Sequence, residues 1–303
     1  MMTTIRNRIC TEIVTFFLSI FLFLPSLSAQ ETTGAPSKSC LWKIESEKNT
    51  VYLLGSIHIL RKANYPLKKP IEDAFDDVRR VVFEIHLDSA EMMSTQMMIL
   101  SKGMFDESMN LHDSIDNTTY DMMRKKFEDF GISLGQMNRF KPWFAALMLT
   151  TLTMQKLGFD PMYGIDRYFF QKAKQTGKKI SALETVGDQI QLLDELSKMN
   201  PRDLILQTLT ELDVFNTEIN ALVASWESGD TRNLENMVLR SFREYPEIYC
   251  KFIFQRNMEW LPKIQYFFTL EENVLVIVGA GHLLGEEGLI ESLRQEGYTV
   301  NQQ

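Results

Sequence analysis

The alternation of short apolar segments with long helical ones limits most strongly what this chain can fold into. Residues 51–54 and 274–278 are uninterrupted apolar runs, and stretches with helical periodicity, often bounded by Pro or Gly, separate such runs along the chain. Strands that are apolar on both faces are typical of parallel sheets covered by helices on each side. The sequence therefore predicts an α/β fold with a mostly parallel central sheet flanked by helices.

The expected elements fill one domain, residues 41–303. Two long stretches, residues 89–175 and 186–267, are helical in pattern, and we expect them to be insertions that form a helical cap. The first two strands are separated by a short polar turn and are predicted to form a hairpin. Strands are expected at residues 41–45, 51–54, 81–85, 179–183, 274–278 and 298–300.

The chain is acidic and poor in cysteine. Its 303 residues carry 32 Lys and Arg against 40 Asp and Glu, a formal net charge of -8, and no basic block. Binding to nucleic acid requires clustered Lys and Arg that neutralise phosphates, so a nucleic-acid partner is not expected. Three Cys without a Cys-x-x-Cys pair exclude a disulfide-rich scaffold.

Residues 1–29 have the pattern of a secretory signal peptide. Arg6 and Arg8 precede a mostly apolar run at residues 13–24, and small residues lead up to a cleavage position near Ala29. The run is shorter than the roughly 20 apolar residues that a transmembrane helix requires. We expect an exported protein, periplasmic or extracellular, with no membrane span after cleavage. An uncleaved N-terminal membrane anchor is the alternative.

Cleavage would leave two cysteines in an oxidising compartment. Residues 30–40 form a small, polar linker at the start of the mature chain, and Cys10 is removed with the signal. A disulfide between Cys40 and Cys250 is then permitted, and we carry it as a hypothesis.

One short unit occurs twice and concentrates half of the histidines. An apolar strand runs into Gly55-Ser-Ile-His58, and another runs into Gly279-Ala-Gly-His282. Glycine lets the backbone turn sharply, so each histidine follows directly on the carboxyl end of its strand. In open α/β sheets that edge is where ligands bind. Two of only four His in the chain therefore point to a functional site.

Two carboxylates have comparable positions. Glu84 lies inside an apolar strand, where an unpaired carboxylate is costly, so it requires a cation, a metal or a hydrogen-bond donor. Glu184 follows the strand at residues 179–183. If these strands are parallel neighbours, both carboxylates converge with His58 and His282 on one rim. Two imidazoles and a carboxylate are a standard ligand set for a catalytic divalent metal.

Each of these residues also has a plainer interpretation. His58 and His282 can be structural histidines at loop starts, and Glu184 can be a charge at a helix N-terminus. Glu84 can form an ion pair with an arginine, the candidates being Arg79, Arg80 and Arg256. The remaining histidines, His86 and His112, are expected at a strand end and on the surface.

The chain resembles the TraB/GumN family over residues 41–302. The family is related to the TIKI metalloproteases and, more remotely, to erythromycin-esterase-like and ChaN-like proteins. Six dispersed motifs occur in the family's order. They are LWKI at 41–44 with VYLLGSIH at 51–58, VFE at 82–84, GIDRYF at 164–169, LETVGDQ at 183–189, RN at 256–257, and VGAGHL at 278–283 followed by Gly288 and GYTV at 297–300.

This resemblance implies an α/β fold whose site contains the two Gly-x-x-His motifs and a glutamate. In TIKI proteins such a site supports metal-dependent cleavage of peptide bonds. Carried over by position, the resemblance implicates His58, Glu84 and His282, with Glu184 and Arg256 in matching motifs as further site residues. The chain departs from the family at residue 86, where a histidine stands in place of the usual Asp or Asn.

The sequence thus predicts an exported metal-dependent hydrolase, a peptidase acting on a peptide or protein. His58 and His282 would bind the metal, which could be Mn, Co or Zn. Glu84 would be a third ligand or the general base, Arg256 would stabilise an oxyanion or orient a substrate carboxylate, and Glu184 would assist catalysis. The alternative is a non-catalytic envelope protein that binds haem, a peptide or a small anionic ligand at the same rim.

Overall fold

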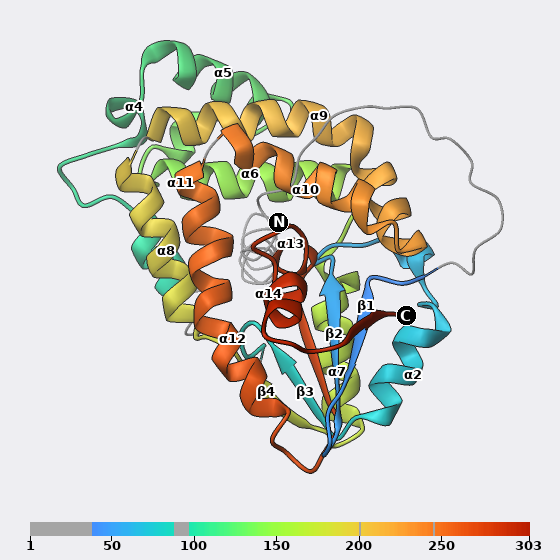
Figure 1. The fold of residues 1–303 in the computed structure, drawn as a ribbon. Coiled ribbons are helices and arrows are strands. Elements are labelled where there is room, and N and C mark those ends of the chain that lie inside the picture. The colour runs from blue at the N-terminus through green and yellow to red at the C-terminus, as the bar shows by residue number, and fades with distance from the viewer. Residues whose placement is uncertain (1–37, 88–96, 200, 245) are drawn as a thin grey trace.

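The described residues form one mixed sheet with helices around it. The computed structural model describes residues 38–87, 97–199, 201–244 and 246–303. Their strands join in the order β4-β3-β5-β2-β1-β6 (Figure 1). The strands are β1 (Leu41–Glu45), β2 (Thr50–Ser56), β3 (Arg80–Phe83), β4 (Lys179–Ala182), β5 (Val274–Gly279) and β6 (Val300–Gln302). The predicted α/β class with a mostly parallel sheet is confirmed.

Strand direction puts four carboxyl ends at one edge. β4, β3, β5 and β2 are parallel, while β1 runs antiparallel to both β2 and β6. The predicted hairpin is β1–β2. In the register, Ser56 lies opposite Gly279, and Phe83 lies opposite both Ile277 and Ala182. Residues that follow these positions therefore emerge side by side.

Helices fill every connection between the parallel strands. Between β2 and β3 lie η1 (Lys62–Asn64) and α2 (Lys69–Asp77). Between β3 and β4 lie α4 (Leu111–Ser114), α5 (Asn117–Glu128), η2 (Leu134–Met137), α6 (Pro142–Lys156), η3 (Pro161–Tyr163) and α7 (Ile165–Gln175). Between β4 and β5 lie α8 (Val186–Met199), α9 (Pro201–Ser228), α10 (Thr231–Glu244), α11 (Pro246–Tyr249), η4 (Cys250–Phe254) and α12 (Gln255–Phe267). After β5 come α13 (Ala280–Leu283) and α14 (Leu289–Gln295).

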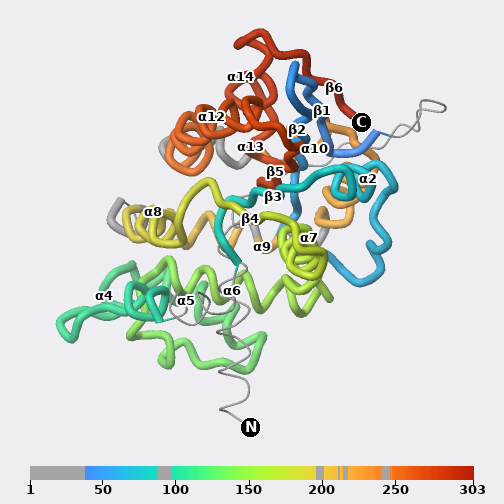
Figure 2. Tube along the Cα trace, turned by 90° about the horizontal axis from the view of Figure 1, so that it is seen from below, coloured from blue at the N-terminus to red at the C-terminus, as the bar shows by residue number. Residues whose placement is uncertain are grey.

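Both faces of the sheet are covered. Helices α12 and α14 lie on one side and α2 and α7 on the other (Figure 2). Phe75 of α2 stacks on Phe169 of α7 at 5.1 Å between ring centroids. Strand β5 is buried along Val274–Val278, in keeping with its apolar sequence. Helices α7 and α12 fall within the two predicted insertions, and here they pack against the sheet.

The other helices of those stretches form a layer beyond the carboxyl ends of the strands. Helices α6, α9 and α10 cross above the end of β2 in Figure 1. Trp226 of α9 donates from Nε1 to the backbone oxygen of Gly55 at 2.6 Å, which ties this layer to the sheet. The layer has its own apolar cluster, which includes Met123, Phe127, Leu149, Ile205 and Leu209. The position of this layer resembles the expected cap.

The predicted signal peptide and most of the linker lie outside the described residues. Of residues 30–40, only residues 38–40 are described. Within the described ranges, the structure contains no helix whose length and apolar character would let it cross a membrane. The domain boundaries remain a prediction.

The hypothesis of a disulfide between Cys40 and Cys250 is not supported, because both are free thiols in the structure. Cys40 is fully buried, and its Sγ lies 2.6 Å from the point where a Cβ on Gly55 would be. Burial raises the pKa of the Cys40 thiol to about 12. Cys250 instead lies partly exposed on η4, where Gln255 Nε2 donates to its Sγ at 3.7 Å.

Cysteine labelling tests this assignment. With maleimide at pH 8, we expect Cys250 to react in the native protein and Cys40 to react only after unfolding, because the thiolate is the reactive form. Peptide mapping by mass spectrometry, with and without reductant, measures both sites. If Cys250 is labelled only after reduction, the hypothesis of a Cys40–Cys250 disulfide is supported after all. Labelling of Cys40 in the native protein would contradict its burial.

Candidate active site

Four polar side chains follow the carboxyl ends of the four parallel strands. His58 comes after β2, Glu84 directly after β3, Glu184 after β4, and His282 within α13 after β5. His58, Glu84 and His282 are only 6%, 1% and 4% exposed. The structure thus brings these residues together at the rim where the sequence places them. Their catalytic and metal-binding roles remain predictions.

Arg256 of α12 joins three of these side chains. Its Nη2 donates to Oε2 of Glu84 at 2.6 Å and to Oε1 of Glu184 at 2.7 Å. Its Nη1 lies 3.0 Å from Nε2 of His282. Of the arginines considered as partners of Glu84, the structure selects Arg256. The buried carboxylate therefore already has a cation, supplied by the chain itself.

Glu184 accepts hydrogen bonds from two nitrogens of the Arg256 guanidinium. Nε of Arg256 donates to Oε2 of Glu184 at 3.2 Å, and with the Nη2 bond this makes a two-pronged contact. Trp260 Nε1 donates to the same Oε2 at 3.2 Å, and Gln189 Nε2 donates to Oε1 at 2.6 Å. The Trp260 ring lies 4.5 Å from the guanidinium carbon of Arg256. In this arrangement Glu184 orients Arg256, and the catalytic role that the sequence indicates for Glu184 stays a prediction.

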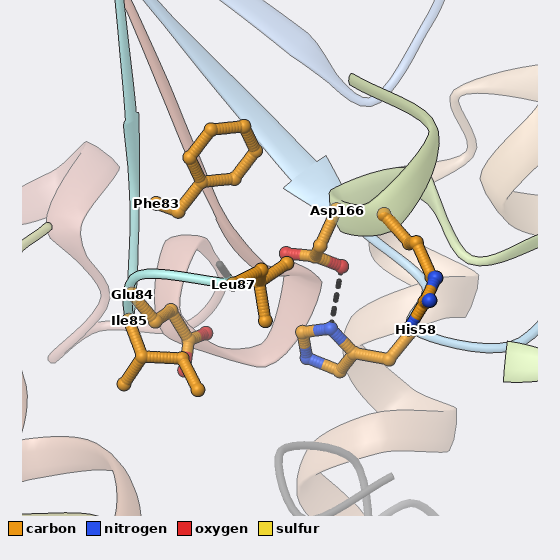
Figure 3. Close-up of a pocket in the computed structure, with 7 residues that line it drawn as sticks. His58, Phe83, Glu84, Ile85, Leu87 and Asp166 are labelled. Atoms are coloured by element: carbon orange, nitrogen blue, oxygen red, sulfur yellow. Dashed lines mark hydrogen bonds and ion pairs between the residues drawn. The ribbon is translucent and has the colours of Figure 1, made fainter. Parts of the chain in front are cut away.

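His58 is paired with a carboxylate. Its Nδ1 lies 2.5 Å from Oδ2 of Asp166, at the start of α7 (Figure 3). A carboxylate only accepts hydrogen bonds, so Nδ1 carries the proton. Burial lowers the pKa of His58, but the Asp166 carboxylate outweighs burial, and the pKa lies above its ordinary value. The sequence singles out His58 and assigns no role to Asp166.

His282 is paired with an amide. Asn257 donates from Nδ2 to the backbone oxygens of His282 and Glu287, both at 3.1 Å. Its Oδ1 is therefore the acceptor, and it lies 2.8 Å from Nδ1 of His282. Nε2 of His282 is left to accept from Arg256. Burial, then the nearby Arg256 and His58 charges, hold the pKa of His282 well below its ordinary value.

Glu84 and Gly279 complete the geometry. The backbone N–H of Gly279 donates to Oε1 of Glu84 at 2.7 Å. A Cβ on Gly279 would lie 3.1 Å from Nε2 of His58, 3.3 Å from Oε1 of Glu84 and 3.7 Å from Cδ2 of His282. We call the position that this Cβ would take, and its immediate surroundings, the space over Gly279. All three predicted metal-site residues, His58, Glu84 and His282, border it. Burial raises the pKa of Glu84, although Arg256 and His58 oppose the shift.

The donor types suit a divalent cation, but Arg256 already contacts two of the donor groups, Glu84 and His282. Two imidazole nitrogens and a carboxylate match catalytic metal sites in chemistry. In the part of the chain that the structure describes, no three His, Cys, Asp or Glu side chains are arranged to hold a metal ion. Nε2 of His282, one of the expected ligand atoms, contacts Nη1 of Arg256 instead. The residues fit a cation on the condition that this contact opens.

A small cavity reaches the same residues from the side of α7. His58, Glu84, Leu87, Asp166 and Arg167 are among its lining residues (Figure 3). Its volume is about 10 Å³, enough for one water molecule. Both a haem group and a peptide are far larger than this space, so either ligand would require a rearrangement.

The other two histidines have the plain positions that the sequence predicts. His86 packs edge-on against Phe170, with 5.4 Å between ring centroids. His112 is exposed on α4 and contacts the ring of Tyr120 at 4.6 Å. Neither histidine is among the residues of the site.

Four residues of the site receive no role from the sequence. They are Asp166, Gln189, Asn257 and Trp260. The first three lie within segments that carry the family resemblance, which is the signal that could have found them. Spacing along the chain does not show that Asp166 faces His58 or that Asn257 faces His282.

Comparison with known proteins places the chain in a family. The model of the TraB/PrgY/gumN family matches residues 40–302. The chain belongs to the TraB/PrgY/gumN family. This match includes every residue of the site just described and confirms the resemblance seen in the sequence. No solved structure matches the chain with significance.

Curated relatives of the chain include proteins named as metalloproteases. Metalloprotease TIKI2 of Xenopus tropicalis is 24% identical, over 86% of this chain and 59% of its own length. A TIKI homolog of Amphimedon queenslandica is 20% identical, over 96% of this chain and 67% of its own. An uncharacterized protein of Treponema pallidum is 22% identical, over 96% of this chain and 93% of its own length. The chain spans about three fifths of the length of the Xenopus relative.

Proposed function

We propose that this member of the TraB/PrgY/gumN family is an exported metal-dependent hydrolase that cleaves peptide bonds. The observation that carries the proposal is the space over Gly279, which Nε2 of His58 and Oε1 of Glu84 both face. Nε2 of His282 lies 3.9 Å from that carboxylate oxygen. The names of the TIKI relatives support a metalloprotease at the family level. Export rests on the pattern of residues 1–29.

His58 and His282 would hold the cation through their Nε2 atoms. Imidazole and carboxylate ligands suit Mn, Co and Zn alike, so the ligand set does not choose among them. A bound divalent cation polarises a carbonyl and makes a water more acidic. His282 would first have to release Nη1 of Arg256. The fork between Arg256 and Glu184 uses Nε and Nη2, so it can persist when Nη1 leaves.

Arg256 would then stabilise the charge that develops on the scissile carbonyl oxygen. Glu184 and Trp260 fix the guanidinium, and its Nη1 donates to the backbone oxygen of Phe252 at 3.1 Å and contacts Nε2 of His282. A donor held in place before the reaction stabilises an oxyanion more than one that must reorient. Arg256 would be the catalytic cation, and Glu184 would keep it in position.

A peptide requires more room than the cavity provides. His58 and Glu84 are almost fully buried, and the cavity between them has a volume of about 10 Å³. Leu87 and Arg167 are lining residues that are only partly buried. We propose that substrate enters on their side, with a rearrangement that exposes Glu84.

Replacement of Glu84 tests the proposal and separates its two roles. We expect Glu84→Gln to lower peptide cleavage by about 10²–10⁴-fold if Glu84 is the general base, with Mn²⁺ affinity retained. If Glu84 is a ligand, the same variant loses Mn²⁺ affinity as well. A diverse peptide mixture with Mn²⁺, Co²⁺ or Zn²⁺, read by mass spectrometry, measures cleavage, and calorimetry measures binding.

The matched control is Glu272→Gln. Glu272 also pairs with an arginine, Arg80 at 2.8 Å, but it is distant from the site in the fold, before β5. This variant should cleave like the unmodified protein. The proposal is wrong if the unmodified protein cleaves no peptide with any of the three metals, or if Glu84→Gln cleaves normally.

A further inference from the structure

The two histidines of the site differ in the partner of their Nδ1 atom. His58 faces the carboxylate of Asp166 at 2.5 Å, and His282 faces the amide oxygen of Asn257 at 2.8 Å. Both partners accept a hydrogen bond from Nδ1–H, so both imidazoles keep the lone pair on Nε2. The two partners differ in charge, because Asp166 is an anion and Asn257 is neutral. The sequence analysis assigns no role to either residue.

The chain holds Asp166 against His58 by several independent contacts. Ser56, the last residue of β2, donates from Oγ to Oδ1 of Asp166 at 3.2 Å. The backbone N–H of Ile165 donates to the oxygen of Ile57 at 3.1 Å. Asp166 is 7% exposed and lies in the first turn of α7, where a negative charge is favoured. The carboxylate therefore has one well-determined position.

Gly164 makes this close approach possible. A Cβ at this position would lie 2.1 Å from the backbone oxygen of His58, much closer than two such atoms can come. Only a residue without a side chain lets the start of α7 lie directly on the loop that carries His58. The chain thus brings Asp166 to His58 through a backbone contact.

We propose that Asp166 is a positioning residue that fixes His58 with Nδ1 protonated and Nε2 directed at the space over Gly279, and that it makes His58 the stronger of the two imidazole donors. A carboxylate that accepts from a metal-binding imidazole fixes the ring and raises its basicity, and loss of such a partner costs about 10–100-fold in metal affinity. A neutral amide fixes the ring with less effect on basicity. The ranking of the two histidines rests on the proposed function, whereas the orientation of His58 does not.

The isosteric variants Asp166→Asn and Asn257→Asp test this assignment. Mn²⁺ affinity, measured by calorimetry on the full chain, should fall by about 10–100-fold in Asp166→Asn. Asn257→Asp places an anion beside His282 and should not weaken Mn²⁺ binding to that extent. Equal losses in the two variants, or an unchanged affinity in Asp166→Asn, would overturn the ranking of the two histidines.

Nitrogen-15 NMR of the metal-free protein reads the orientation of His58 directly. Only four histidines need assignment, which single His→Gln variants provide. We expect a protonated Nδ1 with a strongly hydrogen-bonded proton on His58, and a weaker hydrogen bond to that proton in Asp166→Asn, because an amide oxygen accepts less strongly than a carboxylate. If the signal is absent from the unmodified protein, or is unchanged in the variant, Asp166 does not position His58.

Two further outcomes are decisive. If Asp166→Asn does not fold, Ser56→Ala replaces it, since it removes only the hydroxyl that donates to Oδ1. A weakened His58 signal in Ser56→Ala then supports the assignment, and an unchanged signal contradicts it. If the unmodified protein binds no Mn²⁺, the ranking and the proposed metal role fail together, while the NMR result still decides whether Asp166 positions His58.

Discussion

Replacement of Arg256 by methionine is expected to lower the free energy of unfolding by about 3–5 kcal/mol. The guanidinium is the shared partner of Glu84 and Glu184, whose side chains are 1% and 6% exposed. Removal of one member of a buried ionic group leaves the other charges without their counter-charge and poorly hydrated, and this is costlier than the loss of a surface ion pair. Urea unfolding of the full chain at neutral pH measures the change.

Arg80→Met is the matched control for this prediction. Arg80 also pairs with a glutamate, Glu272, at 2.8 Å, but the arginine side chain is 23% exposed. The carboxylate of Glu272 keeps a second cation, Lys179 at 2.7 Å, so the expected loss is about 1 kcal/mol or less. Arg256→Lys retains the charge but cannot make the two-pronged contact with Glu184. Its loss in the free energy of unfolding should lie between those of Arg256→Met and Arg80→Met. If Arg256→Met costs no more than Arg80→Met, the buried triad of Glu84, Arg256 and Glu184 is not a stabilising unit.

Alanine at Gly279 is expected to reduce metal binding and peptide cleavage by about 100-fold. The new methyl group would lie 3.1 Å from Nε2 of His58 and 3.3 Å from Oε1 of Glu84, in the space that a cation would use. The backbone of Gly279 has φ -50 and ψ 136, which alanine adopts without strain. Mn²⁺ calorimetry and peptide cleavage measure the effect.

Gly281→Ala provides the comparison on the same short helix. Its Cβ would lie 3.0 Å from a methyl carbon of Val238 and 3.7 Å from Ile253, so the crowding is similar but away from the polar side chains. We expect this variant to lose some stability and to keep its affinity for Mn²⁺. A similar affinity for both alanine variants would show that the space over Gly279 is not the site.

The location of the site was predictable because it depends on strand order and strand ends. The apolar runs before Gly55 and Gly279 identify two strands, and a histidine three residues beyond each glycine must lie near the carboxyl edge. The same argument places Glu84 and Glu184. Pairing of β2 with β5 and of β3 with β4 and β5 then brings the four side chains to one rim.

The partners of those side chains were not predictable in the same way. Arg256 lies 172 residues from Glu84 in the chain, and Asp166 lies 108 residues from His58. A hydrogen bond between distant residues depends on the docking of whole helices, here α12 and α7. The sequence offers Arg79 and Arg80 as partners of Glu84 just as readily, and only the packed structure selects among the three.

By itself, the sequence determined the fold class, the rim of the sheet and the residue types that meet there. These follow from local patterns: apolar runs form buried strands, glycines permit the turns, and polar residues after strand ends face the same edge. The tertiary structure decided what each polar group does with its neighbours. In the folded chain Arg256 pairs with Glu84 and Glu184. The carboxylate of Asp166 faces His58, and the amide of Asn257 faces His282. Those choices are made by long-range packing, because a buried charge takes whichever partner the folded chain brings within hydrogen-bond distance.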